Sequence, residues 1–156
     1  MQDKELNKRD FFGYGDTKPK INWPGNKKIA LSIVVNIEEG AELSINSGDS
    51  INEYIYENNK IKLENNLPDL CMESHFEYGL RSGFWRIIHL LDKYKLPVTF
   101  SCCSQALEKS PWLIKEILNR GHEISAHGVK WVSHYNLSEN EERKIINKCY
   151  NDILKL

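Results

Sequence analysis

Residues 122–131, with the sequence HEISAHGVKW, are the most informative stretch of this chain for fold and chemistry. The segment from His122 to His127 predicts a strand that ends in an imidazole. A second histidine at position 131 would place two imidazoles four residues apart, which is a common way to hold a metal ion. Trp131 stands there instead, and its indole nitrogen is a donor only. The stretch therefore predicts a functional strand end that stops short of a metal site.

Two further strands and three helices alternate with this strand along the chain. Residues 29–37 are nearly continuous apolar and β-branched, a pattern typical of a strand buried on both faces. Residues 98–102 form the same kind of pattern. Because helical periodicity separates and follows these segments, the order predicts an α/β fold with right-handed parallel crossovers.

The helices are recognised by their spacing and their ends. Apolar residues recur at helical spacing from Leu80 onward, and Pro97 ends that helix. Ser110 is expected to be the N-cap of the second helix, and Gly121 terminates it. A capping box at Ser138 opens the last helix. Its apolar face is expected to comprise Ile145, Ile146, Tyr150, Ile153 and Leu154.

The remaining segments predict irregular structure. Glycines and prolines between aromatic residues indicate that residues 1–27 form an extended arm, and residues 28–156 form the folded domain. Residues 40–77 show little periodicity, which suggests a long loop excursion from the end of the first strand. Long loops at strand ends often carry function.

Composition narrows the class of protein. The chain has 156 residues, the size of one domain, and its 21 basic and 22 acidic residues leave a net charge of -1, so nothing favours nucleic acid as a partner. No apolar run approaches the roughly 20 residues that span a bilayer, and the polar start is unlike a signal peptide. We expect a cytoplasmic protein without a membrane partner. Its cysteines are expected to be reduced and mostly buried: Cys71, Cys102, Cys103 and Cys149.

Candidate catalytic residues follow the first and third strands. In parallel sheets the ligand site lies at the carboxyl ends of the strands. The first strand ends in Asn36, Glu38 and Glu39, with Glu42 following, and the third presents Ser125, His127 and Trp131. A carboxylate and an imidazole in one pocket can activate water and protonate a leaving nitrogen. Taken singly, each residue has a structural alternative: a solvated turn, a hydrogen-bonded histidine, or packing.

Arg81 lies near the start of the first crossover helix, where the helix dipole favours acids rather than bases. Two interpretations stay open. The guanidinium binds a substrate carbonyl or an acidic partner, or it pairs with Glu38, Glu39 or Glu42 and holds the loop. Of the other histidines, His75, His89 and His134 have weaker claims.

Four blocks together resemble the polysaccharide deacetylase (NodB homology) superfamily, and within it the bacterial allantoinase and cyclic-imide hydrolase subgroup. They are residues 9–15 with 23–25, residues 35–42, residues 78–86 and residues 121–131. The resemblance runs in order from about residue 9 to the end. It implies a distorted (β/α) barrel considerably longer than this chain, of which the chain is the N-terminal half.

The resemblance also implies a chemistry. Metal-dependent members use an aspartate pair on the first strand and two histidines of an HxxxH-type motif. This chain has Asn36 and Glu38-Glu39 in the first region, and His127 with Trp131 in the second. The allantoinase-like subgroup shares this loss, so we expect hydrolysis of a cyclic amide in purine breakdown without a tightly held metal or another cofactor. Whether Asn36 or Glu38 takes the family's base position depends on a one-residue choice of alignment.

In the expected mechanism Glu38 or Glu39 deprotonates a water, and His127 polarises the carbonyl or protonates the departing nitrogen. Asn36, Arg81 and Trp131 bind and orient a planar cyclic amide. The alternative enzyme is a metal-dependent sugar N-deacetylase, in which Glu38 and His127 hold a divalent ion such as zinc with one further ligand.

A non-enzyme alternative is a shortened chain that acts only in binding or assembly. Half a barrel would leave an open sheet edge and an exposed apolar helix face. We therefore expect little activity from these 156 residues alone, and a homo-oligomer for the full-length protein.

Overall fold

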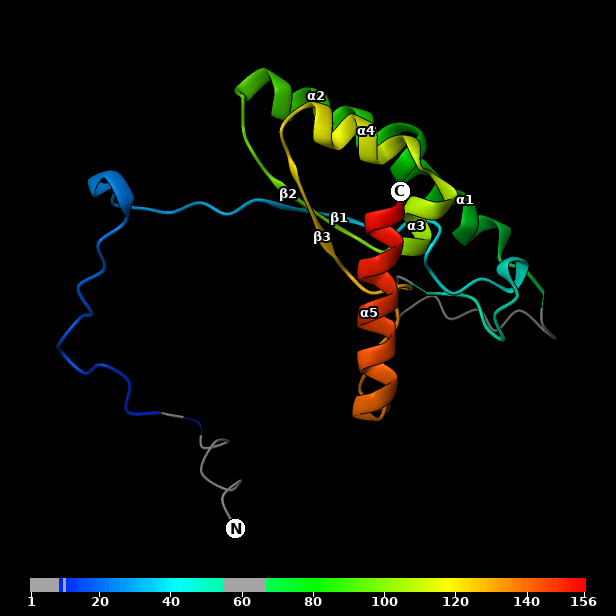
Figure 1. Ribbon diagram of the computed structural model, residues 1–156, viewed down its shortest axis with the longest axis horizontal. Helices are drawn as coiled ribbons and strands as arrows, with labels where there is room; N and C mark the ends of the chain where they lie inside the picture. The colour runs from blue at the N-terminus through cyan, green and yellow to red at the C-terminus, as the bar shows by residue number, and fades with distance from the viewer. Residues whose placement is uncertain (1–8, 10, 55–66) are drawn as a thin grey trace, which may run out of the picture. The chain divides into compact units, whose positions relative to one another are not determined.

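The computed structural model describes residue 9, residues 11–54 and residues 67–156. The chain divides into two units, Met1–Ser32 and Ile33–Leu156. In the described part of the first unit the backbone is extended or turning, apart from the short 3-10 turn η1, Pro24–Asn26. The second unit holds the sheet and the α-helices of the described residues (Figure 1). The expected arm boundary at residue 27 stays a prediction.

The sheet has three parallel strands in the order β1 (Val34–Ile37), β2 (Thr99–Cys102) and β3 (Glu123–Ala126). Ile37 pairs in register with Cys102, and Cys102 with Ala126. The strands therefore end level with one another, so the residues that follow each strand share one edge of the sheet. The predicted α/β fold with parallel strands is confirmed.

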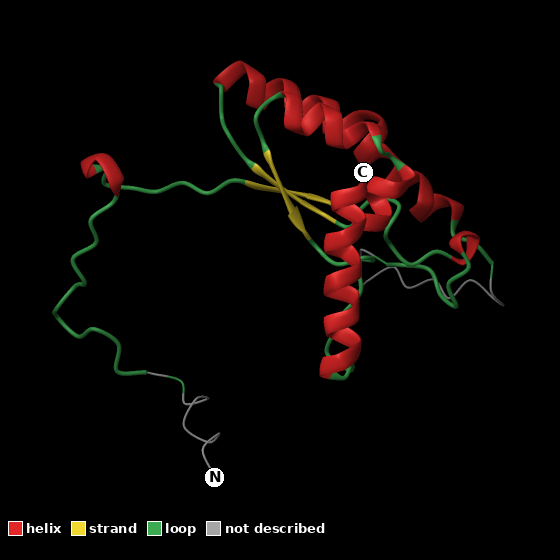
Figure 2. Ribbon diagram, in the orientation of Figure 1, coloured by secondary structure: helices red, strands yellow, loops and turns green. Residues whose placement is uncertain are grey.

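Helices connect the strands (Figure 2). The helix α2 (Phe84–Tyr94) precedes β2; α3 (Ser104–Lys109) and α4 (Trp112–Asn119) lie between β2 and β3; α5 (Glu139–Lys155) follows β3. The helices α2 and α4 lie alongside each other, with the Trp85 ring stacked on Trp112 at 5.3 Å between centroids. Their inner faces and β2 bury side chains in one core: Phe84, Ile88 and Leu91 of α2, Leu113 and Ile117 of α4, and Phe100 of β2.

The first strand is shorter and more exposed than expected. β1 spans only Val34–Ile37, and Ile29 is 80% exposed, so the prediction of a strand over residues 29–37 buried on both faces is wrong. Among the described residues β1 pairs only with β2, which leaves its other edge open. A continuous apolar run cannot by itself distinguish a central strand from an edge strand, because that depends on the neighbours.

Two helices were missed. The predicted loop over residues 40–77 contains a short 3-10 turn, η2 (Ile45–Ser47), and the helix α1 (Leu70–Tyr78), capped by Asp69 Oδ1, which accepts from the Met72 N–H at 3.0 Å. No residue of α1 is buried, so the helix has no apolar stripe to recognise. The helix α3 was also missed. Residues 55–66 of the predicted loop lie outside the described residues.

The predicted helix ends are partly correct. Ser138 and Glu141 form the expected capping box of α5. The N-cap of α4 is Pro111 rather than Ser110, whose side chain caps nothing there. Cys102, Cys103 and Cys149 are buried free thiols and Cys71 is an exposed one, as predicted. Within the described residues no helix is long and apolar enough to cross a membrane.

Candidate active site

A carboxylate and an imidazole meet across the sheet edge. His127 Nε2 lies 3.0 Å from Glu38 Oε1, although β2 separates the strands that these residues follow. Two strand spacings amount to roughly 9.6 Å, a gap that both side chains must share. Because a carboxylate only accepts hydrogen bonds, the pairing places the imidazole proton on Nε2 and leaves Nδ1 as an acceptor.

Glu38 has a second partner at its own strand end. Asn36 Nδ2 donates to Glu38 Oε1 at 3.0 Å, so both donors use the same carboxylate oxygen. Within the described parts of the chain, no group donates to Oε2. The Glu38 side chain is 21% exposed, which gives water access to it. The arrangement leaves Oε2 able to accept a proton from a bound water.

Hydrogen bonds from the backbone and from two buried thiols fix the main chain at His127 and Gly128. The His127 N–H donates to the Cys102 carbonyl at 2.9 Å. Cys103 Sγ donates to the His127 carbonyl at 3.3 Å, and Cys149 Sγ donates to the Gly128 carbonyl at 3.0 Å. Burial raises the pKa of the Cys103 thiol to about 12, so this group stays protonated and remains a donor.

Trp131 lies in the same cavity as His127. This cavity has a volume of about 670 Å³, and its walls combine apolar side chains with several polar ones. The backbone N–H of Trp131 donates to the Ala41 carbonyl at 3.0 Å, which ties the segment after β3 to the segment after β1. Trp131 therefore forms part of the cavity wall, at the sequence position where a metal-binding motif would have its second histidine.

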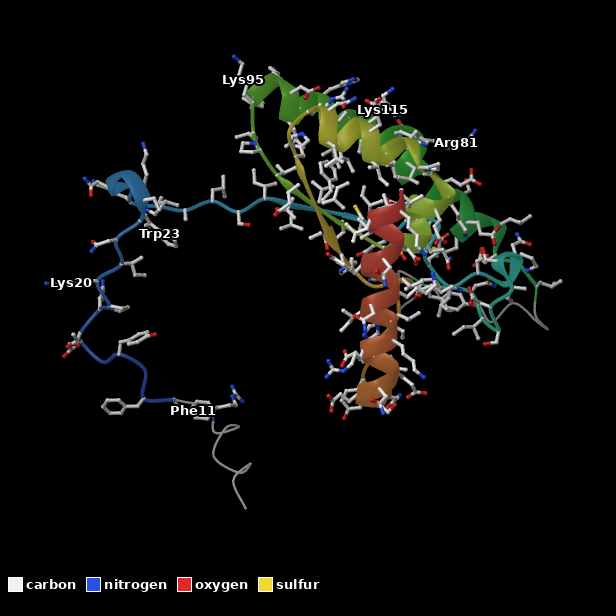
Figure 3. The ribbon with its side chains drawn as sticks, in the orientation of Figure 1. Phe11, Lys20, Trp23, Arg81, Lys95 and Lys115 are labelled. Atoms are coloured by element: carbon white, nitrogen blue, oxygen red, sulfur yellow. The ribbon has the colours of Figure 1, made fainter. Side chains whose placement is uncertain are left out.

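Glu39 and Arg81 lie at a different cavity, of about 450 Å³, which Glu42 also lines. Arg81 Nη1 bonds Glu77 Oε2 at 2.8 Å, and its side chain is 78% exposed and projects outward (Figure 3). The interpretation that Arg81 pairs with Glu38, Glu39 or Glu42 is therefore wrong, because the neighbouring turn of helix supplies a closer acid. Glu42 is buried and accepts a bond from the Gly40 N–H.

Comparison with known proteins identifies the family of this chain. The family model described as polysaccharide deacetylase matches residues 64–156. The chain belongs to the polysaccharide deacetylase family. A Schizosaccharomyces pombe protein that carries the name polysaccharide deacetylase is 37% identical over 142 residues, which cover 90% of this chain and 43% of that protein.

Solved structures agree with the family's barrel architecture. The crystal structure of Puue allantoinase is 33% identical with a TM-score of 0.80. A Pseudomonas aeruginosa PAO1 protein named as a polysaccharide deacetylase is 32% identical with a TM-score of 0.83. In each case the match covers 94% of this chain and 49% of the other. The chain thus spans about half the length of these relatives.

The donor set does not complete the metal site of metal-dependent family members. Glu38 and His127 meet, but Trp131, which lines the same cavity as His127, offers no lone pair to a metal ion. Within the described ranges, no group of three or more His, Cys, Asp and Glu side chains could hold a metal ion. Two protein ligands are fewer than the three that catalytic zinc sites use.

Sequence patterns gave little or no indication of three further residues that line the cavity. Glu53, Lys130 and His134 line the same cavity as His127. Lys130 Nζ pairs with Asp49 Oδ1 at 2.5 Å and so joins two loops. These residues lie on irregular segments without periodicity, and only their position after β1 and β3 could have indicated them.

The Glu39 side chain lies so close to the backbone of Gly79 that it leaves no room for a Cβ there. Gly79 opens a π-helical turn, Gly79–Gly83, and a Cβ there would lie 2.0 Å from Glu39 Oε1. At Gly83, in the same turn, the nearest atom to a Cβ is 3.6 Å away. We expect Gly83→Ala to raise the free energy of unfolding by about 0.5–1 kcal/mol. Gly79→Ala is expected to lower it by about 1 kcal/mol or more, because Glu39 must move.

Urea unfolding of the full-length protein and these two variants measures the difference. The variants share the substitution and the turn, so helix propensity cancels between them. Equal stabilities for the two variants would show that Glu39 does not constrain Gly79.

Glu39 makes stability depend on pH. Burial, the largest influence, raises the pKa of its carboxyl above the ordinary 4.5, against hydrogen bonds from its own N–H and that of Glu38. The folded state therefore keeps this proton to a higher pH than the unfolded chain does. The contribution to stability is full below pH 4.5 and is lost as the pH rises through the folded pKa.

Glu39→Gln is accordingly expected to be more stable than the parent protein at pH 7, and to lose that advantage below pH 4.5. Urea denaturation at both pH values tests this. Glu139→Gln, at a carboxylate 83% exposed on α5, is the matched surface control. A Glu39→Gln protein that is less stable than its parent at pH 7 would contradict the expectation.

Proposed function

We propose that the protein carrying this chain hydrolyses the C–N bond of a cyclic amide, such as an allantoin-like ureide or a cyclic imide, without a tightly held metal. The observation that carries the proposal is the hydrogen bond between Glu38 and His127, beside a cavity that Trp131 lines. The likeness to an allantoinase structure supports the substrate class.

In the proposed reaction Glu38 Oε2 accepts a proton from water while the oxygen attacks the substrate carbonyl carbon. The C–N bond then breaks, His127 protonates the departing nitrogen, and Glu38 returns a proton to His127. One water is added across the bond and no fragment leaves, because the broken bond was part of a ring. Positioned acid–base groups of this kind contribute roughly 10²–10⁴-fold to rate.

The remaining residues orient the pair or the substrate. Asn36 holds the Glu38 carboxylate through its 3.0 Å bond, and Trp131 offers an aromatic face to a planar ring. Glu39 and Arg81 line a different cavity from the one that His127 lines. A catalytic role for Glu39 and a substrate contact for Arg81 therefore stay predictions. Cytoplasmic location, purine breakdown and homo-oligomerisation also stay predictions.

The test compares two reactions of the full-length protein. Ring opening of allantoin and of cyclic imides yields a new carboxylic acid, whereas N-deacetylation of N-acetylglucosamine oligomers releases acetate. Both products are quantified before and after exhaustive dialysis against a chelator, with elemental analysis of the protein. We expect ring opening that survives dialysis.

Two outcomes would overturn the proposal. Acetate release that requires a retained stoichiometric ion would support the metal-dependent deacetylase, with Glu38 and His127 as two of its ligands. Absence of both reactions, with intact folding, would support the alternative in which the chain acts only in binding or assembly.

A further inference from the structure

The cavity beside His127 contains a second imidazole. His134 lines it together with His127 and Trp131, but it follows β3 by a longer irregular segment and takes no part in the proposed reaction. Its side chain is 24% exposed. An imidazole inside a substrate-sized cavity is a candidate for direct contact with the ligand.

His134 is oriented by a carboxylate. Its Nδ1 lies 3.2 Å from Oε1 of Glu142, in the first turn of α5. Because the carboxylate only accepts, Nδ1 carries the proton and Nε2 of the neutral ring keeps its lone pair. The Leu137 N–H donates to the His134 carbonyl at 3.0 Å, and the Ser138 capping box fixes the start of α5. Both backbone and ring are therefore held.

The acceptor nitrogen faces the residue after His127. A Cβ built on Gly128 would lie 3.9 Å from His134 Nε2, and Gly128 also lines the cavity. The cation of Lys130 is already paired with Asp49. Glu53 accepts a bond from the Tyr54 N–H at 3.1 Å. Of the polar groups around the cavity, Nε2 of His134 is thus a fixed acceptor with no partner among the described residues.

We infer that His134 is a substrate-binding residue, which accepts a hydrogen bond from a ring N–H on the edge of the substrate away from the bond that breaks. This inference rests on the proposed function and narrows its substrate class. The substrate is a planar ring with one hydrolysable amide beside Glu38 and His127 and a further N–H donor toward His134, as in a cyclic ureide. N-alkylation of that nitrogen removes the donor.

The experiment pairs a change in the protein with a change in the substrate. The full-length protein, His134→Ala and His134→Gln are assayed with a hydantoin-type cyclic ureide and with its derivative methylated at the distal nitrogen. Loss of one hydrogen bond is expected to raise KM roughly 3–10-fold with little change in kcat. The parent protein should prefer the unmethylated ring by that factor, and His134→Ala should show no preference.

Two controls separate a binding role from a structural one. His134→Gln, whose amide oxygen can still accept, should recover part of the preference. Tyr135→Phe, at a side chain 92% exposed next to His134, should behave as the parent protein does. If His134→Ala weakens both substrates equally, or if the preference survives the substitution, the inference is overturned.

Failure of the proposed function can be distinguished from failure of this inference. If the parent protein opens neither ring, calorimetric binding of both compounds to the parent and to His134→Ala still decides the role of His134. A preference for the N–H ring that disappears in His134→Ala supports it, and a lack of binding to the parent protein overturns it.

Discussion

Glu38→Gln is expected to lower kcat for ring opening by roughly 10²–10⁴-fold, with little change in KM. Glutamine keeps the shape of the side chain, and its carbonyl can still accept from Asn36 and His127, which lie 3.0 Å from Glu38 Oε1. It cannot take a proton from water. The loss is therefore expected in the chemical step rather than in substrate binding.

Glu39→Gln is the matched control, because it makes the same change one residue later. Glu39 lies against Gly79 and lines the cavity that Arg81 shares, not the one of His127. We expect it to lower kcat by less than about 10-fold, since it removes no acid–base group from the reacting pair. Steady-state kinetics of the full-length variants decide between the two carboxylates. A larger loss for Glu39→Gln than for Glu38→Gln would reassign the base.

Trp131→His is expected to tighten zinc binding by about 100-fold or more and to abolish ring opening. The substitution adds an imidazole to the wall of the cavity that His127 already lines. The 3.0 Å between His127 Nε2 and Glu38 Oε1 is close to the roughly 3.3 Å between two ligands of a tetrahedral zinc ion. A metal ion would then replace the proton that the pair shares, which removes Glu38 as a base. Changes around metal ligands already alter affinity roughly 10–100-fold, and a ligand is worth at least that.

Competition with a chromophoric chelator measures the zinc affinity of the full-length variants. Trp131→Phe is the control, because it keeps an aromatic wall and adds no ligand. Unchanged zinc affinity in Trp131→His would mean that the side chain at position 131 does not reach the Glu38 and His127 pair. Tight zinc binding by the parent protein would instead favour the metal-dependent deacetylase.

Local patterns sufficed where the structure depends on neighbours in the sequence. Helical spacing from Phe84 to Tyr94, the capping box at Ser138 and the strand before His127 follow from periodicity and capping. The same logic failed at residues 29–33 and 70–78. The burial of the first strand depends on its partners, and α1 buries none of its residues. The periodicity of the sequence therefore predicts neither the exposure of residues 29–32 nor the helix at residues 70–78.

Local sequence patterns are enough to place two adjacent carboxylates and a histidine at one edge of a parallel sheet, because the alternation of strands and helices and the strand ends follow from them. Which of the two carboxylates meets the imidazole depends on the three-dimensional packing. Successive residues leaving a strand point to opposite sides, so Glu38 turns toward His127 and Glu39 toward the glycine turn. The pairing of His134 with Glu142 was likewise set by packing, because no helical spacing links these two residues. Arg81 and Glu77 instead stand four residues apart on neighbouring turns of helix, a spacing that local sequence already favours.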